Sequence, residues 1–203
     1  KFVCPNDTTK LVYRRSDFLE MNMIQDILAN QTPDVLVMNR GAHYVNDKQL
    51  LTELDPVLDV VLDYMYQPPA HNTTTATSTH RRRLLFWRTT VPGHPRCWNY
   101  TKPATSIEEM ETLVANISLY DYREGASEFK WWEFKHQNEL VLHLLQNKTS
   151  SRTFNVSTTS SNSRPRSVVQ IMDGYDLLLL RPDLHRTHRY DCLHQCMPGP
   201  FDV

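Results

Sequence analysis

Three short apolar runs are the strongest strand signals in the chain. They occupy residues 34–38, 84–90 and 167–172 and are rich in β-branched, leucine and aromatic side chains. Runs of this length and composition predict buried strands. Turn-forming residues follow the first run as Asn39-Arg40-Gly41 and the second as the segment 91–95.

Apolar residues at helical spacing predict four helices between and after these strands, at residues 16–29, 46–66, 106–118 and 127–146. Ser16 or Asp17 would cap the first helix. Ser106 and Glu109 form a capping-box pattern at the start of the third. Pro56 predicts a kink in the second helix.

Two polar, low-complexity segments, 71–83 and 149–167, predict flexible inserts. The type of the short apolar run 176–180 stays open. Because strands alternate with helices, we expect an α/β fold with a mostly parallel sheet, in a single domain that spans residues 1–203. Sites in such folds form at the carboxyl ends of the strands, where the segments 39–44, 88–95 and 181–196 would lie.

Composition excludes several classes of function. The 203 residues carry a net charge of −1, which argues against binding to nucleic acid or anionic membranes through bulk charge. Only 5 residues are glycine, and neither glycine-rich nucleotide-binding motif occurs. No apolar run approaches the ~18 residues of a membrane span. The hydrophobic content of 40% supports a folded core.

Glycosylation motifs indicate a secretory protein. The pattern N-x-[ST] is a glycan acceptor and occurs about three times more often than composition alone would give. The acceptors are Asn6, Asn30, Asn72, Asn99, Asn116, Asn147 and Asn155. The chain starts at Lys1 without a signal segment, so we expect it to be processed, truncated or a fragment.

Four cysteines fit the same compartment, since in oxidising surroundings they form disulfides. They are Cys4, Cys97, Cys192 and Cys196, and the sequence leaves their pairing open. A zinc site is a weaker alternative, because three histidines crowd Cys192 and Cys196. Their spacing matches no usual structural zinc pattern, and we expect no metal.

The sequence D-x-x-H at Asp191 and His194 is the strongest catalytic candidate. An aspartate can orient an imidazole through one ring nitrogen and leave the other free to accept a proton from a serine. The plainer alternative is a surface pair beside a disulfide. Asn39 and Gly41 can donate hydrogen bonds to an oxyanion, although an ordinary turn favours the same residues.

The segment 87–94 holds a further candidate group. Arg88 can bind a carboxylate, and Trp87 can stack on a sugar, unless both belong to a buried strand. Trp131 and Trp132 diverge by about 100° on a helix, so at most one of them belongs to the core. In a glycan-binding protein, Trp87, Trp98, Trp131 and Trp132 could serve as sugar platforms.

Several blocks of the chain resemble the trichome-birefringence-like and PC-esterase family, in the family's order. The tail YDCLHQCMPGPFDV resembles D-C-x-H-W-C-L-P-G-x-x-D-x-W-N, with Gln195 in place of tryptophan. DVLVMNRGAHYV resembles D-V-L-V-x-N-T-G-H-W-W, and WRTTVPGHPRCWN resembles F-R-T-x-S-P-x-H-F. RPDLH resembles the D-G-H that precedes the tail motif, and LVYRRSDFLE resembles a segment before the first block.

This resemblance implies a flavodoxin-like, three-layer fold of the SGNH-hydrolase type. It implies an acyl esterase or glycan O-acetyltransferase that works through an acyl-serine, with His194 as general base and Asp191 as its orienter. The implied oxyanion or substrate-binding residues are Asn39, Gly41, His43, Arg88 and His94. The implied location is the Golgi lumen, with a membrane anchor outside this chain, or secretion.

The partners implied are a glycan or polysaccharide acceptor and an acyl donor such as acetyl-CoA, with no resident cofactor and no nucleic acid. The family's nucleophile lies in a G-D-S block, which these residues lack. We expect that block, with the first strand, upstream of Lys1. The alternative is a non-catalytic glycan-binding or interaction module that kept the fold and lost the serine.

Overall fold

A computed structural model of the chain describes residues 2–3, 10–67, 83–120, 126–154, 168–186 and 191–195. Its centre is a parallel sheet with the strand order β3-β4-β5, where the strands are Val35–Met38, Leu84–Arg88 and Val169–Met172. Val35 pairs with Leu84, and Leu85 pairs with Val169. The three predicted strands and the α/β class are therefore confirmed.

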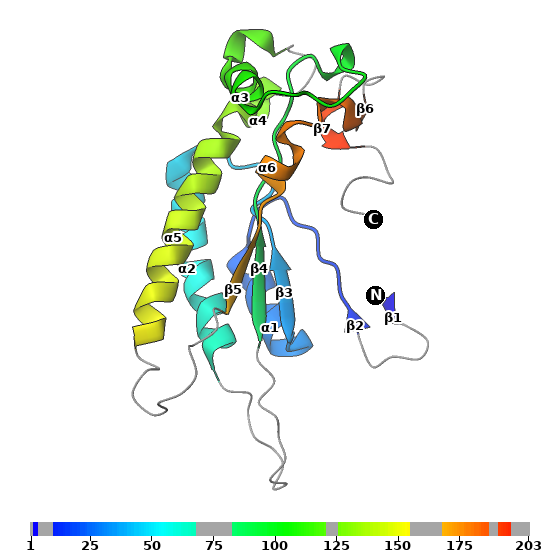
Figure 1. Ribbon diagram of the computed structural model, residues 1–203. Coiled ribbons are helices and arrows are strands. Elements are labelled where there is room, and N and C mark those ends of the chain that lie inside the picture. Colours follow the sequence, from blue (N-terminus) through cyan, green and yellow to red (C-terminus); the bar gives the residue numbers. More distant parts are fainter. Residues whose placement is uncertain are drawn as a thin grey trace, which may run out of the picture.

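Three helices pack on one face of this sheet: α1 (Met21–Gln31), α2 (Asp47–Tyr66) and α5 (Phe134–Phe154). Figure 1 shows α2 and α5 side by side, with α1 behind the strands. Their buried side chains form one cluster with Met38, Leu85 and Trp87 of the strands. None of the helices in the described ranges is both long and apolar enough to cross a membrane.

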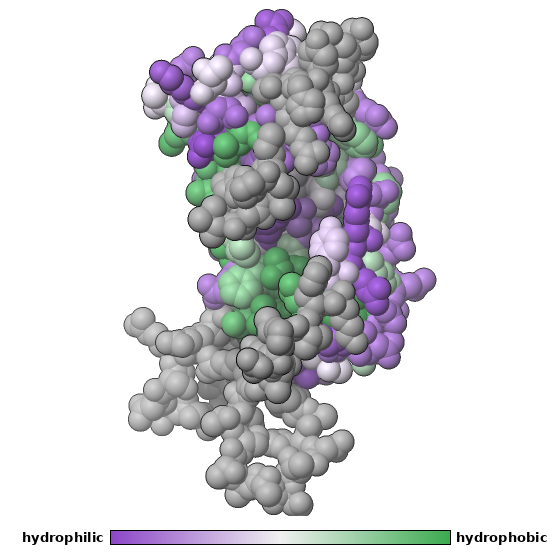
Figure 2. Space-filling model, turned by 90° about the vertical axis from the view of Figure 1, so that its right-hand side faces the viewer, coloured by the Kyte–Doolittle hydropathy of each residue, from purple (hydrophilic) through white to green (hydrophobic). Residues whose placement is uncertain are grey.

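None of the helices in the described ranges packs on the opposite face of the sheet. Val35 and Val37 are 53% and 58% exposed, and Met172 on the same face is 40% exposed. The prediction of a buried strand at 34–38 is therefore wrong for this face. Figure 2 looks from the right-hand side of Figure 1, where β3 is the edge strand, and shows hydrophobic side chains gathered near the middle of this view. Parallel sheets are normally covered on both faces.

A second group of elements lies beyond the carboxyl ends of the strands, at the top of Figure 1. It has its own buried cluster, which includes Met110, Trp131, Phe134 and Cys192. The elements are η1 (Cys97–Asn99), α3 (Ile107–Ala115), η2 (Ile117–Leu119), α4 (Ala126–Phe129), η4 (Trp131–Glu133), α6 (Gly174–Leu179), η5 (Pro182–Leu184), β6 (His185–Arg186) and β7 (Asp191–Gln195). Near the N-terminus, β1 (Phe2–Val3) pairs with β2 (Lys10–Leu11).

Two predicted helix starts are confirmed, and one of them has the cap that the sequence predicts. Asn46 precedes α2 and accepts a hydrogen bond from the backbone N–H of Gln49. The Ser106 hydroxyl accepts one from the N–H of Glu109 at the start of α3, as the capping-box pattern predicts. Pro56 lies inside α2, and the run at 176–180 contributes to α6.

Other boundaries differ from the prediction. Helix α1 begins at Met21, so Ser16 and Asp17 do not cap it. The predicted helix 127–146 is broken at Lys130, whose φ of 47° is left-handed. Helix α5 then continues to Phe154 and takes in the first part of the predicted insert 149–167. The segments 68–82 and 155–167, which hold most of both inserts, lie outside the described residues.

Paired valines test which face of the sheet is covered. Val61→Thr puts a hydroxyl into the fully buried core of α2 and should lower the free energy of unfolding by about 1–3 kcal/mol. Val37→Thr on the open face should change it by less than about 0.5 kcal/mol. Urea denaturation measures both, and an equal loss in the two variants would contradict an open face.

Candidate active site

The Asp191–His194 pair forms within strand β7 itself. His194 Nδ1 lies 3.0 Å from Asp191 Oδ1, and the backbone N–H of His194 donates to the same oxygen at 2.9 Å. Residues three apart on a regular strand point to opposite faces. Here the β6–β7 pairing shifts register, from His185↔Gln195 to Arg186↔Asp191, and this irregularity brings the two side chains together.

The charge on Asp191 suits an orienting role. Burial alone would raise the pKa of Asp191, but hydrogen bonds from the backbone and ring of His194 outweigh it, and the pKa is lowered. The His194 side chain is 74% exposed. Its other ring nitrogen, Nε2, has no hydrogen-bond partner among the described residues, so it is available to a hydroxyl group from outside.

The Asn39 side chain ties the turn after β3 to the end of β4. Its Nδ2 donates to Arg88 O at 2.8 Å and lies 3.4 Å from Thr90 Oγ1, and its Oδ1 accepts from the N–H of Gly41 at 2.7 Å. Both predicted oxyanion donors are therefore engaged inside the protein. Their role as oxyanion donors stays a prediction. It would require Asn39 and Gly41 to give up these internal hydrogen bonds in exchange for hydrogen bonds to the oxyanion.

The remaining predicted binding residues lie in different surroundings. His43 is half-buried against the Phe129 ring, with Asp17 Oδ1 3.7 Å from its Nε2. Arg88 is half-buried at the end of β4, where burial lowers its pKa. His94 is fully buried, and its side chain contacts His185 rather than the surface.

A disulfide joins the loop after β4 to β7. Cys97 and Cys192 are bonded across a sequence separation of 95 residues, which confirms that these two cysteines form a disulfide. The N–H of His94 also donates to Cys192 O at 2.9 Å. Because Cys192 is in this disulfide, it cannot supply a thiolate to the zinc site that was the weaker alternative. Cys4 and Cys196 lie outside the described residues.

Arg40 lies in the predicted turn 39–41, and nothing in the sequence pattern indicates that its side chain is buried. Its side chain is 2% exposed and stacks on the Phe134 ring, 5.0 Å from the centroid. None of its three guanidinium nitrogens has a hydrogen-bond partner among the described residues. Burial lowers its pKa to about 10.

Two predicted tryptophan platforms are core residues. Trp87 and Trp131 are almost completely buried, whereas Trp98 and Trp132 are half-buried. The prediction that at most one of the adjacent tryptophans belongs to the core is confirmed. Sugar stacking on Trp87 or Trp131 is excluded while these side chains stay buried.

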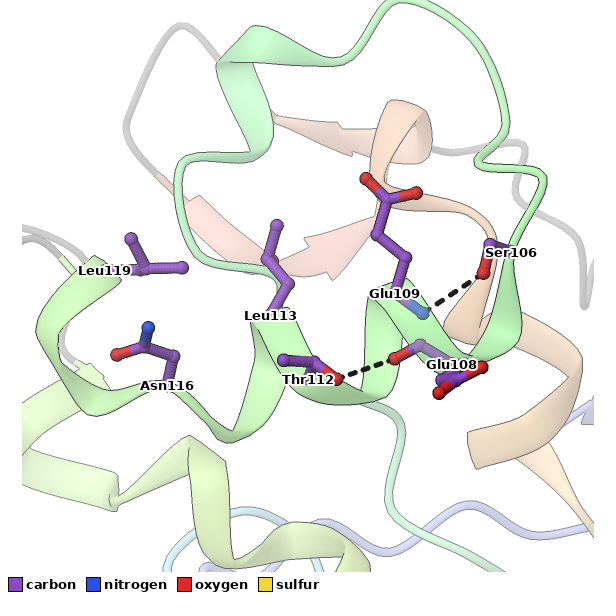
Figure 3. A pocket seen from close by; sticks show the side chains of 7 residues that line it. All are labelled: Ser106, Glu108, Glu109, Thr112, Leu113, Asn116 and Leu119. Atoms are coloured by element: carbon purple, nitrogen blue, oxygen red, sulfur yellow. Dashed lines mark hydrogen bonds between the residues drawn. The ribbon is translucent and has the colours of Figure 1, made fainter.

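A surface hollow of about 490 Å³ lies on α3. Figure 3 shows that its lining runs along the length of this helix, from the Ser106 cap to Asn116, and ends at Leu119 of η2. None of the predicted catalytic or binding residues lines it. Asn116 belongs to a glycosylation motif and, like Asn30, Asn99 and Asn147, it is exposed. Glycosylation of these sites stays a prediction, and Asn6, Asn72 and Asn155 lie outside the described residues.

Curated proteins of Arabidopsis thaliana are similar to this chain. Protein trichome birefringence-like 25 is 28% identical over 194 residues, which cover 80% of the chain and 34% of the relative. Protein trichome birefringence-like 24 is 24% identical over 179 residues, which cover 80% of the chain and 36% of the relative. The chain thus spans about a third of the length of these relatives.

No family model and no solved structure matches the chain. The α/β sheet, the motifs and these relatives together define a distant homologue of the trichome birefringence-like proteins, which confirms the resemblance. The homology and the disulfide point to the secretory pathway.

Replacing Arg40 should stabilise the protein. A buried charge without hydrogen-bond partners costs free energy, so Arg40→Met should raise the free energy of unfolding by about 1–3 kcal/mol. Arg152→Met is the matched control, because Arg152 pairs with Asp59 and Asp63 and its removal should not stabilise. Urea denaturation of both variants measures the effect; destabilisation by Arg40→Met would show that the guanidinium has a partner.

Acid should destabilise the protein through His94. Burial, with a contribution from His185, lowers the pKa of His94 to about 3. The unfolded chain then binds more protons, so stability is complete above the unfolded pKa of about 6.5 and is lost as the pH falls. His94 alone should lower the free energy of unfolding by about 2 kcal/mol between about pH 7 and about pH 5.

Urea denaturation at several pH values measures this slope. Replacement of the exposed His143 on α5 by glutamine is the control and should leave the slope unchanged. A stability that does not vary with pH in this range would contradict a neutral, buried His94.

Proposed function

We propose that this chain supplies the acid–base half of an acyl-transfer site, in which Asp191 orients His194 and His194 Nε2 accepts a proton from a serine. The observation that carries the proposal is the 3.0 Å contact between Asp191 Oδ1 and His194 Nδ1, with the ring otherwise exposed. This contact fixes the ring and keeps the proton on Nδ1, so that Nε2 is the basic atom.

The reaction proposed is double displacement. The serine oxygen attacks the acyl carbonyl while its proton passes to His194 Nε2, and the donor's leaving group departs with that proton. A sugar hydroxyl then attacks the acyl-serine and loses its proton to the same nitrogen, which returns it to the serine. Acetyl transfer to a polysaccharide or glycoprotein glycan in the Golgi lumen is the version that the family resemblance supports, and water as acceptor gives an esterase.

The nucleophile in this proposal is a serine outside the 203 residues, since no G-D-S block occurs within them. The open apolar face of the sheet supports a larger, three-layer arrangement, because a parallel sheet needs cover on both faces. A further strand at an edge of the sheet and a helix over this face would complete a flavodoxin-like fold of the SGNH type. The single-domain boundary at 1–203 remains a prediction.

The complete gene product tests the proposal. His194→Ala should lower acetyl transfer to an oligosaccharide by about 10³-fold or more, and Asp191→Asn should cause a loss of similar order, since it removes the orienting carboxylate. Mass spectrometry of the acceptor measures transfer. His143→Ala, an exposed histidine on α5, is the control.

Unimpaired transfer by the His194→Ala variant would contradict the catalytic role. Saturable binding to glycans without any acyl turnover by the unaltered protein would favour the alternative, a glycan-binding module that lost its serine. The observation that favours this glycan-binding alternative is that these residues contain no G-D-S block.

A further inference from the structure

A pair of buried histidines lies directly behind the Asp191–His194 pair. His94 and His185 are 0% and 3% exposed, and His94 Nδ1 lies 2.7 Å from His185 Nε2. At one end of the pair, His94 Nε2 lies 2.8 Å from Leu179 O. At the other, His185 Nδ1 lies 3.1 Å from the backbone oxygen of His194.

Counting protons shows what this arrangement requires. A carbonyl oxygen only accepts, so each outer nitrogen needs a proton to bond its carbonyl, and the inner contact needs one more. Three protons are therefore needed, whereas two neutral imidazoles carry two. A neutral pair that keeps the inner hydrogen bond can bond only one of the two carbonyls, and one additional proton allows all three hydrogen bonds.

Burial and neighbouring charges determine how readily the pair takes up that additional proton. Burial disfavours it on either ring and lowers the pKa of both histidines. Asp183 of η5 favours it on both rings, Asp191 of β7 favours it on His185, and the His194 ring opposes it there. The pair is thus neutral near neutral pH and takes up a proton in acid.

The contacts of the pair converge on the backbone that carries the catalytic candidate. The N–H of His94 holds Cys192 O, and His185 Nδ1 faces the carbonyl oxygen of His194. Asp191 binds the same residue from its N–H side and its ring. Because the His194 side chain is mostly exposed, its angle depends on how these contacts hold its backbone.

We propose that His185, oriented by His94, is a positioning residue whose Nδ1–H holds the His194 carbonyl and thereby sets the angle at which His194 presents Nε2. The proposal rests on the proposed function of His194. It assigns to His94 and His185 an indirect role through His194, and neither ring touches the substrate. This assignment places the one outer proton of the neutral pair on His185 Nδ1 and leaves His94 Nε2 without a proton until a third proton joins the pair in acid.

Substitution of His185 in the complete gene product tests this role. His185→Leu removes the donor and should lower kcat on the order of tenfold to a hundredfold with little change in KM, since a small misplacement of a catalytic group has effects of this size. His185→Asn keeps an N–H donor near the position of Nδ1 and should recover most of the activity. His143→Leu, at the exposed site on α5, is the control.

Nitrogen NMR of protein with labelled histidines provides a readout that does not depend on activity. The unaltered protein should show a proton on His185 Nδ1 wherever it is folded, and a third proton on the pair in acid. In His185→Leu, the ring of His194 should lose its single defined tautomer. This spectrum judges the positioning role even if the His194→Ala variant proves to be fully active and the proposed function fails.

Two results would overturn the inference. One is a folded His185→Leu variant with unchanged kcat and an unchanged His194 spectrum. The other is an unaltered protein in which His185 Nδ1 carries no proton at any pH at which it is folded; this second measurement also decides the case if His185→Leu does not fold.

Discussion

The disulfide between Cys97 and Cys192 is the constraint on which the candidate site depends. It joins the loop that leaves the centre of the sheet to a short strand that follows 95 residues later. Closing a loop of this length removes much of the unfolded chain's freedom and stabilises by about 4–5 kcal/mol in the chain-entropy view. This link fixes the place of the short β6–β7 pair.

Close packing of Gly93 against Trp131 fixes the same loop at a second point. A Cβ on Gly93 would lie 2.4 Å from the buried Trp131 ring, so only glycine allows the loop to approach this closely. His94 follows directly and bonds α6, β6 and β7. Packing against Trp131 therefore places the histidine whose contacts reach the catalytic pair, and a change far from His194 can alter its angle.

Polar groups at the carboxyl ends of the strands are mostly paired with one another. Asn138 of α5 bonds both backbone groups of Thr90, and the Thr89 hydroxyl donates to Asp173 after β5. Together with the bond from Asn39 Nδ2 to Arg88 O, these bonds connect the three strand ends. Arg40 is the exception: its guanidinium stacks on Phe134 but has no hydrogen-bond partner among the described residues, and burying such a charge costs stability.

Local sequence was sufficient for features whose cause is local. The strand runs, the Ser106 cap and the start of α2 depend on neighbouring residues, and all were predicted correctly. The length of α5 was not, because Lys148 and Arg152 are held by acidic residues of α2 that lie about 90 positions earlier. The break at Lys130 likewise reflects the burial of Trp131 against a distant glycine.

The candidate site also combines features that local sequence predicts with features that depend on distant residues. The geometry of Asp191 and His194 is contained in four consecutive residues, since one carboxylate oxygen accepts from the N–H of Leu193, the N–H of His194 and its ring. Spacing alone could therefore identify this pair. The backbone of His194 is held by His185, and His185 by a histidine 91 positions away, so no local pattern predicts them. An aspartate can orient an imidazole only as well as the backbone beneath it is fixed, which makes the buried histidines as relevant to the proposed chemistry as the motif itself.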